Sequence, residues 1–187
     1  MEDIKIKCIY SIHAILAWMG FLDGASTIAE AMEKPHLEKF INELLEEEIK
    51  PIILTEYPSL ESEELNSICY EFLERCREST DDLVTRVGRD PLRKLNTGGR
   101  IRGLIEIAQK NSMKIKLEKI EYGIAAGFMY ALKDIDPENR SCVKIKEIFS
   151  ENSCDYGALL CYSGEAPCED FIDFDPVKYE KIIKNII

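Results

Sequence analysis

The amino-acid sequence predicts an all-α protein. Apolar residues recur at helical spacing from end to end, and no stretch shows the strict alternation or the valine-rich runs that are typical of a sheet. The chain has 187 residues, 45% of them apolar, which is enough for one domain with a substantial core. We therefore expect residues 1–187 to form a single helical domain.

The first helix is expected over residues 4–22. Its apolar stripe consists of Ile4, Cys8, Ile12, Ile15 and Met19, and its opposite side is made apolar by Ala14, Ala17 and Trp18. A helix that is apolar all round belongs in the centre of a domain. The same run could be mistaken for a signal peptide, but Glu2 and Asp3 spoil a basic leader and the run is too short to span a bilayer. We predict a buried helix in a cytoplasmic protein.

Two helices are expected in the next segment. Thr27 and Glu30 have the spacing of a capping box, which predicts a short helix that ends before Pro35. A longer amphipathic helix follows, and Pro51 should bend or end it. We interpret the acidic face of this helix as solvated; it consists of Glu43, Glu46, Glu47 and Glu48.

Four more helices are expected further along the chain. One begins at Ser62 and runs to about Glu78, with Cys69 and Cys76 as small core residues on its apolar stripe. Two others cover residues 101–110 and 117–132, and the second should pack closely through its Ala-Ala-Gly stretch. A last helix begins at Asp175, where proline occupies the first turn.

The segment from residue 81 to 103 differs in kind because it gathers positive charge. Its basic residues are Arg86, Arg89, Arg93, Lys94, Arg100 and Arg102, interspersed with glycine and proline. The whole chain carries a formal charge of -11, which argues against nucleic acid or an anionic membrane as a partner. An arginine fork fits phosphate bidentately, so Arg89, Arg93 and Lys94 are candidates for binding a phosphate. Contacts to another domain, or to the chain's own glutamates, remain open alternatives.

The cysteine pattern predicts no metal site. The seven cysteines form no CxxC pair and have no companion histidine cluster, which is typical of a reduced protein. Cys154, Cys161 and Cys168 recur every seven residues, but that spacing fits no common ligand set. The sequence also has no GxGxxG after a strand and no GxxxxGK[ST], so neither common nucleotide-binding loop is encoded in these residues.

Two segments resemble a known family. The run Lys5-Ile-Lys-Cys-Ile-Tyr10-Ser-Ile-His13, with the small apolar helix after it, is similar to the long-chain, metal-independent polyol dehydrogenases. The run Arg86-Val-Gly-Arg-Asp-Pro-Leu-Arg-Lys-Leu95 narrows the resemblance to mannitol-1-phosphate dehydrogenases. The resemblance covers residues 1–140 and implies a helical domain like the C-terminal domain of 6-phosphogluconate dehydrogenase. Residues 141–187 are expected to form a divergent tail packed on it.

The resemblance implies catalytic roles for three residues. In the family pattern a lysine is the general base, which requires a pKa lowered toward neutrality by burial or by nearby positive charge. An asparagine and a histidine hold the substrate oxygen as hydrogen-bond donors. Lys5 and His13 match the lysine and the histidine, whereas Tyr10 stands at the asparagine position. On a helix the three residues fall within an arc of about 140° and could face one cleft.

The resemblance also implies a function. We expect the substrate-binding and catalytic half of an NAD-dependent dehydrogenase acting on mannitol 1-phosphate and fructose 6-phosphate. NAD would be bound mainly by a domain outside these residues, such as a separate nucleotide-binding subunit. The alternative is a non-catalytic domain that binds a sugar phosphate or another protein, which Tyr10 and the missing cofactor loop favour. Self-association into a homo-oligomer is expected in either case. Whether the chain is a split subunit, a fragment or a descendant without activity stays open.

Overall fold

The computed structural model describes residues 7–96, 98–133 and 136–151. Lys5, the cysteines at 154, 161 and 168, and the helix expected from Asp175 lie outside the described residues. In the described part the chain is helical and forms no strand; an isolated bridge joins Thr27 to Leu83. The elements are α2 (Ile9–Leu22), α3 (Ile28–Met32), α4 (Pro35–Leu44), the π-helix η1 (Leu45–Ile49), α5 (Lys50–Glu56), α6 (Ser62–Glu78), α7 (Val84–Gly88), α8 (Pro91–Leu95), α9 (Arg102–Lys110), α10 (Glu118–Lys133) and α11 (Arg140–Glu151). The all-α prediction is confirmed.

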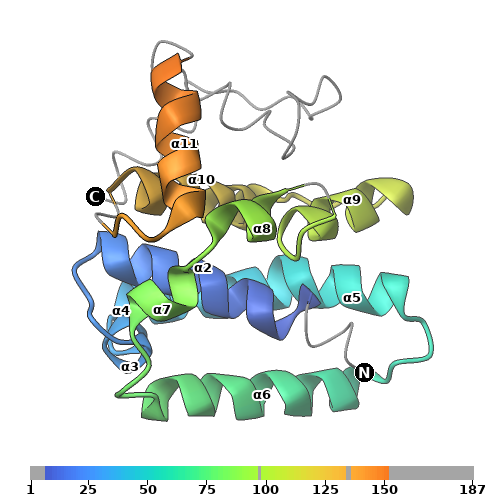
Figure 1. The fold of residues 1–187 in the computed structure, drawn as a ribbon. Helices are drawn as coiled ribbons and strands as arrows, with labels where there is room; N and C mark the ends of the chain where they lie inside the picture. The colour runs from blue at the N-terminus through green and yellow to red at the C-terminus, as the bar shows by residue number, and fades with distance from the viewer. Residues whose placement is uncertain (1–6, 97, 134–135, 152–187) are drawn as a thin grey trace.

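Helix α2 is the central element, as its apolar sequence predicts. It crosses the middle of Figure 1, with α6 along the lower edge and α8, α9 and α10 above it. Helices α3, α7 and α10 pack against α2. Ile12, Ile15 and Trp18 are completely buried. Because most of α2 is buried, a polar side chain on its enclosed faces must meet either a partner or a pocket, whereas Tyr10 near its start is exposed.

The close packing predicted for α10 is present. A Cβ atom on Gly123 would lie 2.5 Å from Cδ1 of Ile15, and one on Gly127 would lie 2.7 Å from Cζ3 of Trp18. Both distances are too short for a side chain, so these glycines let the backbone of α10 approach α2. Trp18 is thereby fixed from the side of α10.

Pro51 does not end the amphipathic helix. The helix widens into η1 directly before the proline and then continues as α5 to Glu56. Proline supplies no N–H, and its ring crowds the carbonyl four residues earlier, which belongs to Glu47. The wider π turn accommodates this crowding without breaking the helix.

The interpretation of the acidic face as solvated is wrong for Glu48. Its side chain is 3% exposed, and its two carboxylate oxygens accept hydrogen bonds from the backbone N–H groups of Lys119 (2.7 Å) and Ile120 (2.8 Å). These are donors in the first turn of α10, which have no partner within the helix. Glu48 therefore joins η1 to α10, and its carboxylate stabilises the N-terminus of α10 by its interaction with the helix dipole.

Several local predictions are confirmed. Thr27 caps α3 through its hydroxyl, which accepts a hydrogen bond of 3.2 Å from the N–H of Glu30. Helix α6 spans the expected residues, and Cys69 and Cys76 are buried on it.

Helix α11 is an addition to the predicted elements. It packs against α8 and α10 through a buried face made by Cys142, Ile145 and Ile148.

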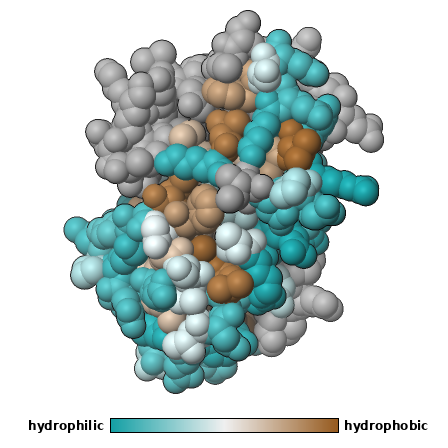
Figure 2. Space-filling model, turned by 60° about the vertical axis from the view of Figure 1, so that its left-hand side comes forward, coloured by the Kyte–Doolittle hydropathy of each residue, from teal (hydrophilic) through white to brown (hydrophobic). Residues whose placement is uncertain are grey.

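The surface combines a charged exterior with limited apolar exposure. On the face seen in Figure 2, hydrophobic side chains lie in a band framed by hydrophilic ones. Within the part of the chain that the structure describes, no helix has the length and apolar character needed to cross a bilayer.

Candidate functional site

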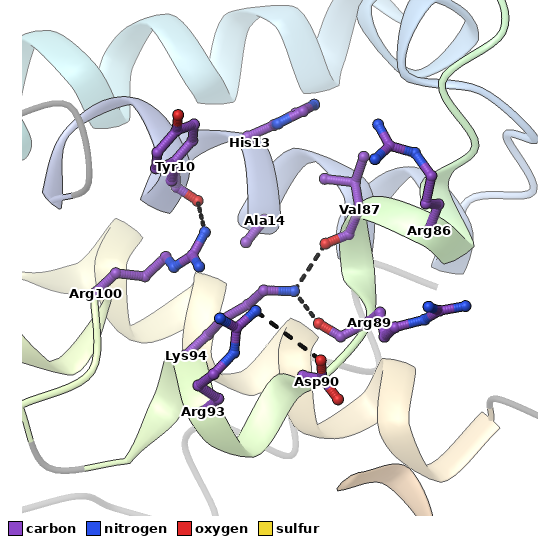
Figure 3. A pocket seen from close by; sticks show the side chains of 10 residues that line it. All are labelled: Tyr10, His13, Ala14, Arg86, Val87, Arg89, Asp90, Arg93, Lys94 and Arg100. Carbon is purple, nitrogen blue, oxygen red and sulfur yellow. Dashed lines mark hydrogen bonds and ion pairs between the residues drawn. The ribbon is translucent and has the colours of Figure 1, made fainter. Parts of the chain in front are cut away.

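The basic segment and the motif on α2 meet at one pocket of about 200 Å³. Helix α2 contributes Tyr10 and His13, α8 contributes Arg93 and Lys94, and the loop before α9 contributes Arg100. Helix α7 contributes Arg86 and Val87, and the turn from α7 to α8 contributes Arg89 and Asp90. Figure 3 shows these side chains around the central ammonium of Lys94.

The position of α7 is fixed by two buried aromatic residues. Trp18 donates a hydrogen bond of 2.8 Å from its indole N–H to the carbonyl of Gly88, and the hydroxyl of Tyr130 donates one of 3.3 Å to the carbonyl of Thr85. After α7, Asp90 adopts the left-handed conformation with φ 55°, which aspartate tolerates better than most residues. Pro91 then begins α8. The chain is thereby turned so that α8 presents its basic side chains to α2.

The turn after α8 returns Arg100 to the same pocket. Gly98 has φ 69°, and a Cβ atom on Gly99 would lie 2.7 Å from the carbonyl oxygen of Lys94. The hydroxyl of Ser11 donates a hydrogen bond of 2.9 Å to the carbonyl of Arg100 and ties the turn to α2. The guanidinium of Arg100 lies 5.6 Å from the ring centroid of Tyr10, in cation–π contact.

Lys94 is a buried lysine, with 3% of its surface exposed. Its ammonium donates hydrogen bonds to the carbonyls of Val87 (2.8 Å) and Arg89, and it lies 5.6 Å from the ring centroid of Trp18. Burial, followed by the positive charge of Arg100 and Arg93, lowers the pKa of Lys94 to about 7. Lys94 is therefore close to half protonated at neutral pH.

His13 lies at the edge of the pocket as a neutral imidazole. Its Nε2 atom is 3.5 Å from a carboxylate oxygen of Asp82, and its ring meets Phe72 edge-on at 5.4 Å between centroids. Burial lowers the pKa of His13 to about 4, although Asp82 acts in the opposite direction. At pH 7 the imidazole can both donate and accept a hydrogen bond.

The pocket carries a strong excess of positive charge. The carboxylate of Asp82 holds Arg86, with 3.0 Å between Nε and the oxygen. Asp90 is 3.9 Å from Arg93, a loose ion pair. Burial and the charge of Arg93 lower the pKa of Arg100, so these two guanidinium groups repel each other. An anion bound between them would relieve this repulsion.

A larger groove of about 850 Å³ adjoins this pocket and shares Tyr10 and His13 with it. The groove is lined mainly by residues of α6, together with Asp82. His13 therefore stands between a small basic pocket and a larger groove.

The described residues contain no group of three or more histidine, cysteine, aspartate or glutamate side chains that could hold a metal ion. The basic pocket itself is lined by four arginines, Lys94 and His13.

Comparison with known proteins identifies the family. The model of the mannitol dehydrogenase C-terminal domain matches residues 1–150. The chain belongs to this family. Mannitol-1-phosphate 5-dehydrogenase of Thermoanaerobacter pseudethanolicus is 30% identical over 135 residues, which are 72% of this chain and 34% of that protein. The enzyme of the same name from Bacillus pumilus is 29% identical over 182 residues, covering 97% of this chain and 43% of that protein. The chain thus spans about a third to two fifths of these relatives.

A solved structure shows the same fold. The mannitol 2-dehydrogenase of Pseudomonas fluorescens, in a ternary complex with NAD and D-mannitol, matches with a TM-score of 0.67 and 18% sequence identity. The match covers 99% of this chain and 37% of the other. The resemblance stated from the sequence is therefore confirmed at the level of fold and family.

Five of the six residues singled out by sequence are brought together in this mannitol dehydrogenase C-terminal domain, and the sixth, Lys5, lies outside the described residues. Tyr10, His13, Arg89, Arg93 and Lys94 all line the same pocket, although the sequence separates the two groups by about seventy-five residues. For two of these residues the polar group is not directed at the centre of the pocket. Figure 3 shows that the hydroxyl of Tyr10 and the guanidinium of Arg89 both point away from the ammonium of Lys94. Their predicted roles in catalysis and substrate binding stay predictions.

Sequence reasoning missed two residues that line the pocket, Arg86 and Arg100, and one residue of the adjoining groove that contacts His13, Asp82. Arg86 and Arg100 belong to the basic segment but were not assigned to the site. Their positive charge was the feature of the sequence that could have identified them. Asp82 carries no such signal, because an acidic residue ahead of a short helix is common on protein surfaces. Its contact with His13 arises only when α2 and the segment before α7 come together.

Proposed function

We propose that this chain is the substrate-binding and catalytic domain of an NAD-dependent polyol-phosphate dehydrogenase that interconverts mannitol 1-phosphate and fructose 6-phosphate. The observation that carries the proposal is the basic pocket, in which four arginines and Lys94 face a single acidic residue, Asp90. The motif on α2 places His13 at the same pocket. Relatives named mannitol-1-phosphate 5-dehydrogenase support the choice of a phosphorylated substrate.

In the proposed complex the phosphate group binds between Arg93 and Arg100, next to Lys94. Their charges are uncompensated apart from the loose pair with Asp90, so a phosphate dianion would be attracted and held by charge-assisted hydrogen bonds. The anion would raise the pKa of Lys94 from about 7, because a negative charge favours the ammonium form. Substrate binding above pH 7 should therefore take up a proton at Lys94.

The residues of α2 would act on the polyol part of the substrate. The resemblance assigns the removal of the hydroxyl proton to Lys5, which lies outside the described residues. His13 is suited to hold the reacting oxygen, because its imidazole is neutral at pH 7 and Asp82 orients it.

The basic pocket does not fit the cofactor. A volume of about 200 Å³ is too small for a dinucleotide, and the sequence contains no glycine-rich phosphate loop. We propose that NAD is bound by a nucleotide-binding domain outside these residues, and that this domain meets the present one beside His13. A homo-oligomer and a cytoplasmic location complete the proposal; the cysteines of the described part, all free thiols, are compatible with a reducing compartment.

The decisive experiment is a reductase assay. The chain would be co-expressed with the nucleotide-binding part of a mannitol-1-phosphate 5-dehydrogenase, and NADH consumption followed with fructose 6-phosphate. We expect activity that needs both parts and that falls at least a hundredfold in Lys5→Ala and His13→Ala. Lys39→Ala on the exposed face of α4 is the matched control, since Lys39 only forms a surface pair with Glu43. Unchanged activity in Lys5→Ala would refute the catalytic assignment.

A second candidate is a domain that binds a sugar phosphate without chemistry. Tyr10 favours it, because the family's asparagine is absent and the tyrosine hydroxyl points away from Lys94. Calorimetric titration with mannitol 1-phosphate distinguishes both candidate functions from a domain that has lost ligand binding altogether. Both predict binding that is lost in Arg93→Gln and kept in Arg77→Gln, where the arginine pairs with Glu38 on a different surface. Binding without reductase activity would support this second candidate.

A further inference from the structure

Two cysteines from different helices meet inside the core. The sulfur atoms of Cys8 and Cys69 lie 3.6 Å apart, in hydrogen-bonding contact, although the residues are 61 positions apart in the sequence. Cys8 is the residue directly before α2, and Cys69 lies in the middle of α6. Both are essentially buried, at 0% and 1% exposure. The pair takes no part in the basic pocket.

The geometry is close to that of a disulfide. A disulfide requires a sulfur–sulfur distance of about 2.0 Å, so the two atoms must approach by roughly 1.5 Å. Rotation of the cysteine side chains supplies part of this movement. Cys8 stands at the start of its helix, where the backbone yields more easily than in the middle of α6. The required shift is therefore small and falls on the end of one helix.

The pKa values of the two thiols are shifted in opposite directions. The hydrogen bond from Cys8 lowers the pKa of Cys69, and the ammonium of Lys50 adds to this effect. The same hydrogen bond, together with burial, raises the pKa of Cys8. Cys69 is therefore the thiol that ionises first and becomes the nucleophile, because the thiolate is the reactive form of cysteine. Cys8 is placed to react with whatever forms on Cys69.

We propose that Cys8 and Cys69 form a dithiol that a hydroperoxide oxidises to an intramolecular disulfide between α2 and α6. The Cys69 thiolate attacks hydrogen peroxide, forming an S–O bond as the O–O bond breaks, and hydroxide leaves. The sulfur of Cys8 then attacks the sulfenic sulfur, so that the S–S bond forms and the S–O bond breaks. Two thiols lose two electrons in total, and the peroxide with their two protons becomes two molecules of water.

The cross-link would act on the helix that carries the candidate site. Cys8 precedes Tyr10 and His13 on α2, and Cys69 precedes Phe72 on α6, whose ring contacts His13. A disulfide would fix the spacing of these two helices at one end. It would also constrain the unfolded chain by closing a long loop, so the oxidised protein should melt at a higher temperature. This inference does not rest on the proposed function.

The test is to map the oxidised thiols in the full chain. Reduced protein would be treated with hydrogen peroxide, quenched with catalase, alkylated under denaturing conditions and digested without reductant for mass spectrometry. We expect a peptide in which Cys8 is linked to Cys69, reversed by dithiothreitol, and a melting temperature several degrees above that of the reduced protein. Cys8→Ser should abolish the shift and leave Cys69 as a sulfenic acid that dimedone captures.

The matched control is Cys76→Ser on the same helix. Burial raises the pKa of Cys76 to about 12, so this thiol should stay reduced and its removal should leave both the linked peptide and the melting shift in place. The proposal is overturned if Cys8 and Cys69 remain fully alkylatable after peroxide, or if either is found bridged to a different cysteine. Mapping on the unmodified sequence decides the matter even if a serine variant does not fold.

Discussion

The buried ammonium of Lys94 should make the stability of the fold depend on pH. Its pKa is about 7 in the folded protein and about 10.4 in an unfolded chain. The folded state therefore favours the neutral amine, and the unfolded state binds more protons throughout this interval. The contribution of Lys94 to stability therefore rises with pH between 7 and 10.4, because the unfolded chain has to hold a proton that becomes scarcer. Below pH 7 both states are protonated and the gain is lost.

The size of the effect follows from the two pKa values. At pH 7 the folded state holds about half a proton on Lys94 and at pH 8.5 almost none, while the unfolded state holds one throughout. Integration over this interval gives a rise of about 1.6 kcal/mol in the free energy of unfolding. The interval ends at pH 8.5 because of Cys76, whose pKa is about 12 in the folded protein. At higher pH this thiol ionises in the unfolded chain but not in the folded one, which lowers the free energy of unfolding.

Urea denaturation at pH 7.0 and 8.5, at constant ionic strength, measures this rise. Lys94→Met keeps the length of the side chain and removes its titration, so the variant should lose about 1.6 kcal/mol of the pH-dependent difference. Lys39→Met, at an exposed position of α4, should show the same pH dependence as the unmodified protein. The difference between the two variants therefore isolates the contribution of Lys94 from that of the other titrating groups. The reasoning is refuted if Lys94→Met retains the full rise, since Lys94 would then have an ordinary pKa.

Three further predictions concern packing, capping and the histidine. Gly123→Ala places a methyl group 2.5 Å from Cδ1 of Ile15 and should destabilise the fold by about 1–3 kcal/mol in urea melts. Adding Ile15→Ala should recover part of this loss, because the smaller side chain makes room for the methyl group. If the effects of the two substitutions simply add, the predicted clash is absent. Glu48→Ala leaves two backbone donors of α10 without their acceptor and should cost about 1–3 kcal/mol, whereas Glu48→Gln, which keeps one acceptor oxygen, should cost less. Asp82→Asn removes the charge that raises the pKa of His13, so an NMR titration should find that pKa below about 4; a higher value would disprove the assigned contact.

The long helices could be predicted from sequence because local signals are strong there. The apolar surroundings of Trp18 identify α2, and the Thr27 cap locates the start of α3. Helices α7 and α8 have five residues each, which is too short for a periodic pattern. Their conformation depends on tertiary contacts, such as the hydrogen bond from Trp18 to Gly88. The same limit applies to η1, where the response of the helix to Pro51 could not be foreseen.

The candidate site could be predicted only in part. Motifs on α2 and α8 identified His13 and Lys94, and the excess of positive charge indicated an anion. The burial of Lys94 could not be predicted, because it depends on Trp18, 76 positions earlier, and on the carbonyl groups of the α7–α8 turn. The pKa of a lysine is set by such surroundings rather than by its neighbours in sequence. Asp82 was missed for the same reason.

Tyr10 is the departure from the family pattern that the structure explains best. Its ring supports the guanidinium of Arg100 at 5.6 Å, and its backbone carbonyl lies 3.5 Å from the same group, while its hydroxyl points away from Lys94. The ring, rather than the hydroxyl, should therefore serve the pocket by holding Arg100 in place. Tyr10→Phe should keep the affinity for mannitol 1-phosphate in calorimetry, whereas Tyr10→Asn should weaken it several-fold, because a cation–π contact at a partly exposed site contributes about 0.5–1 kcal/mol. Weaker binding in Tyr10→Phe would show instead that the hydroxyl contacts the ligand, and would restore to Tyr10 the donor role of the family's asparagine.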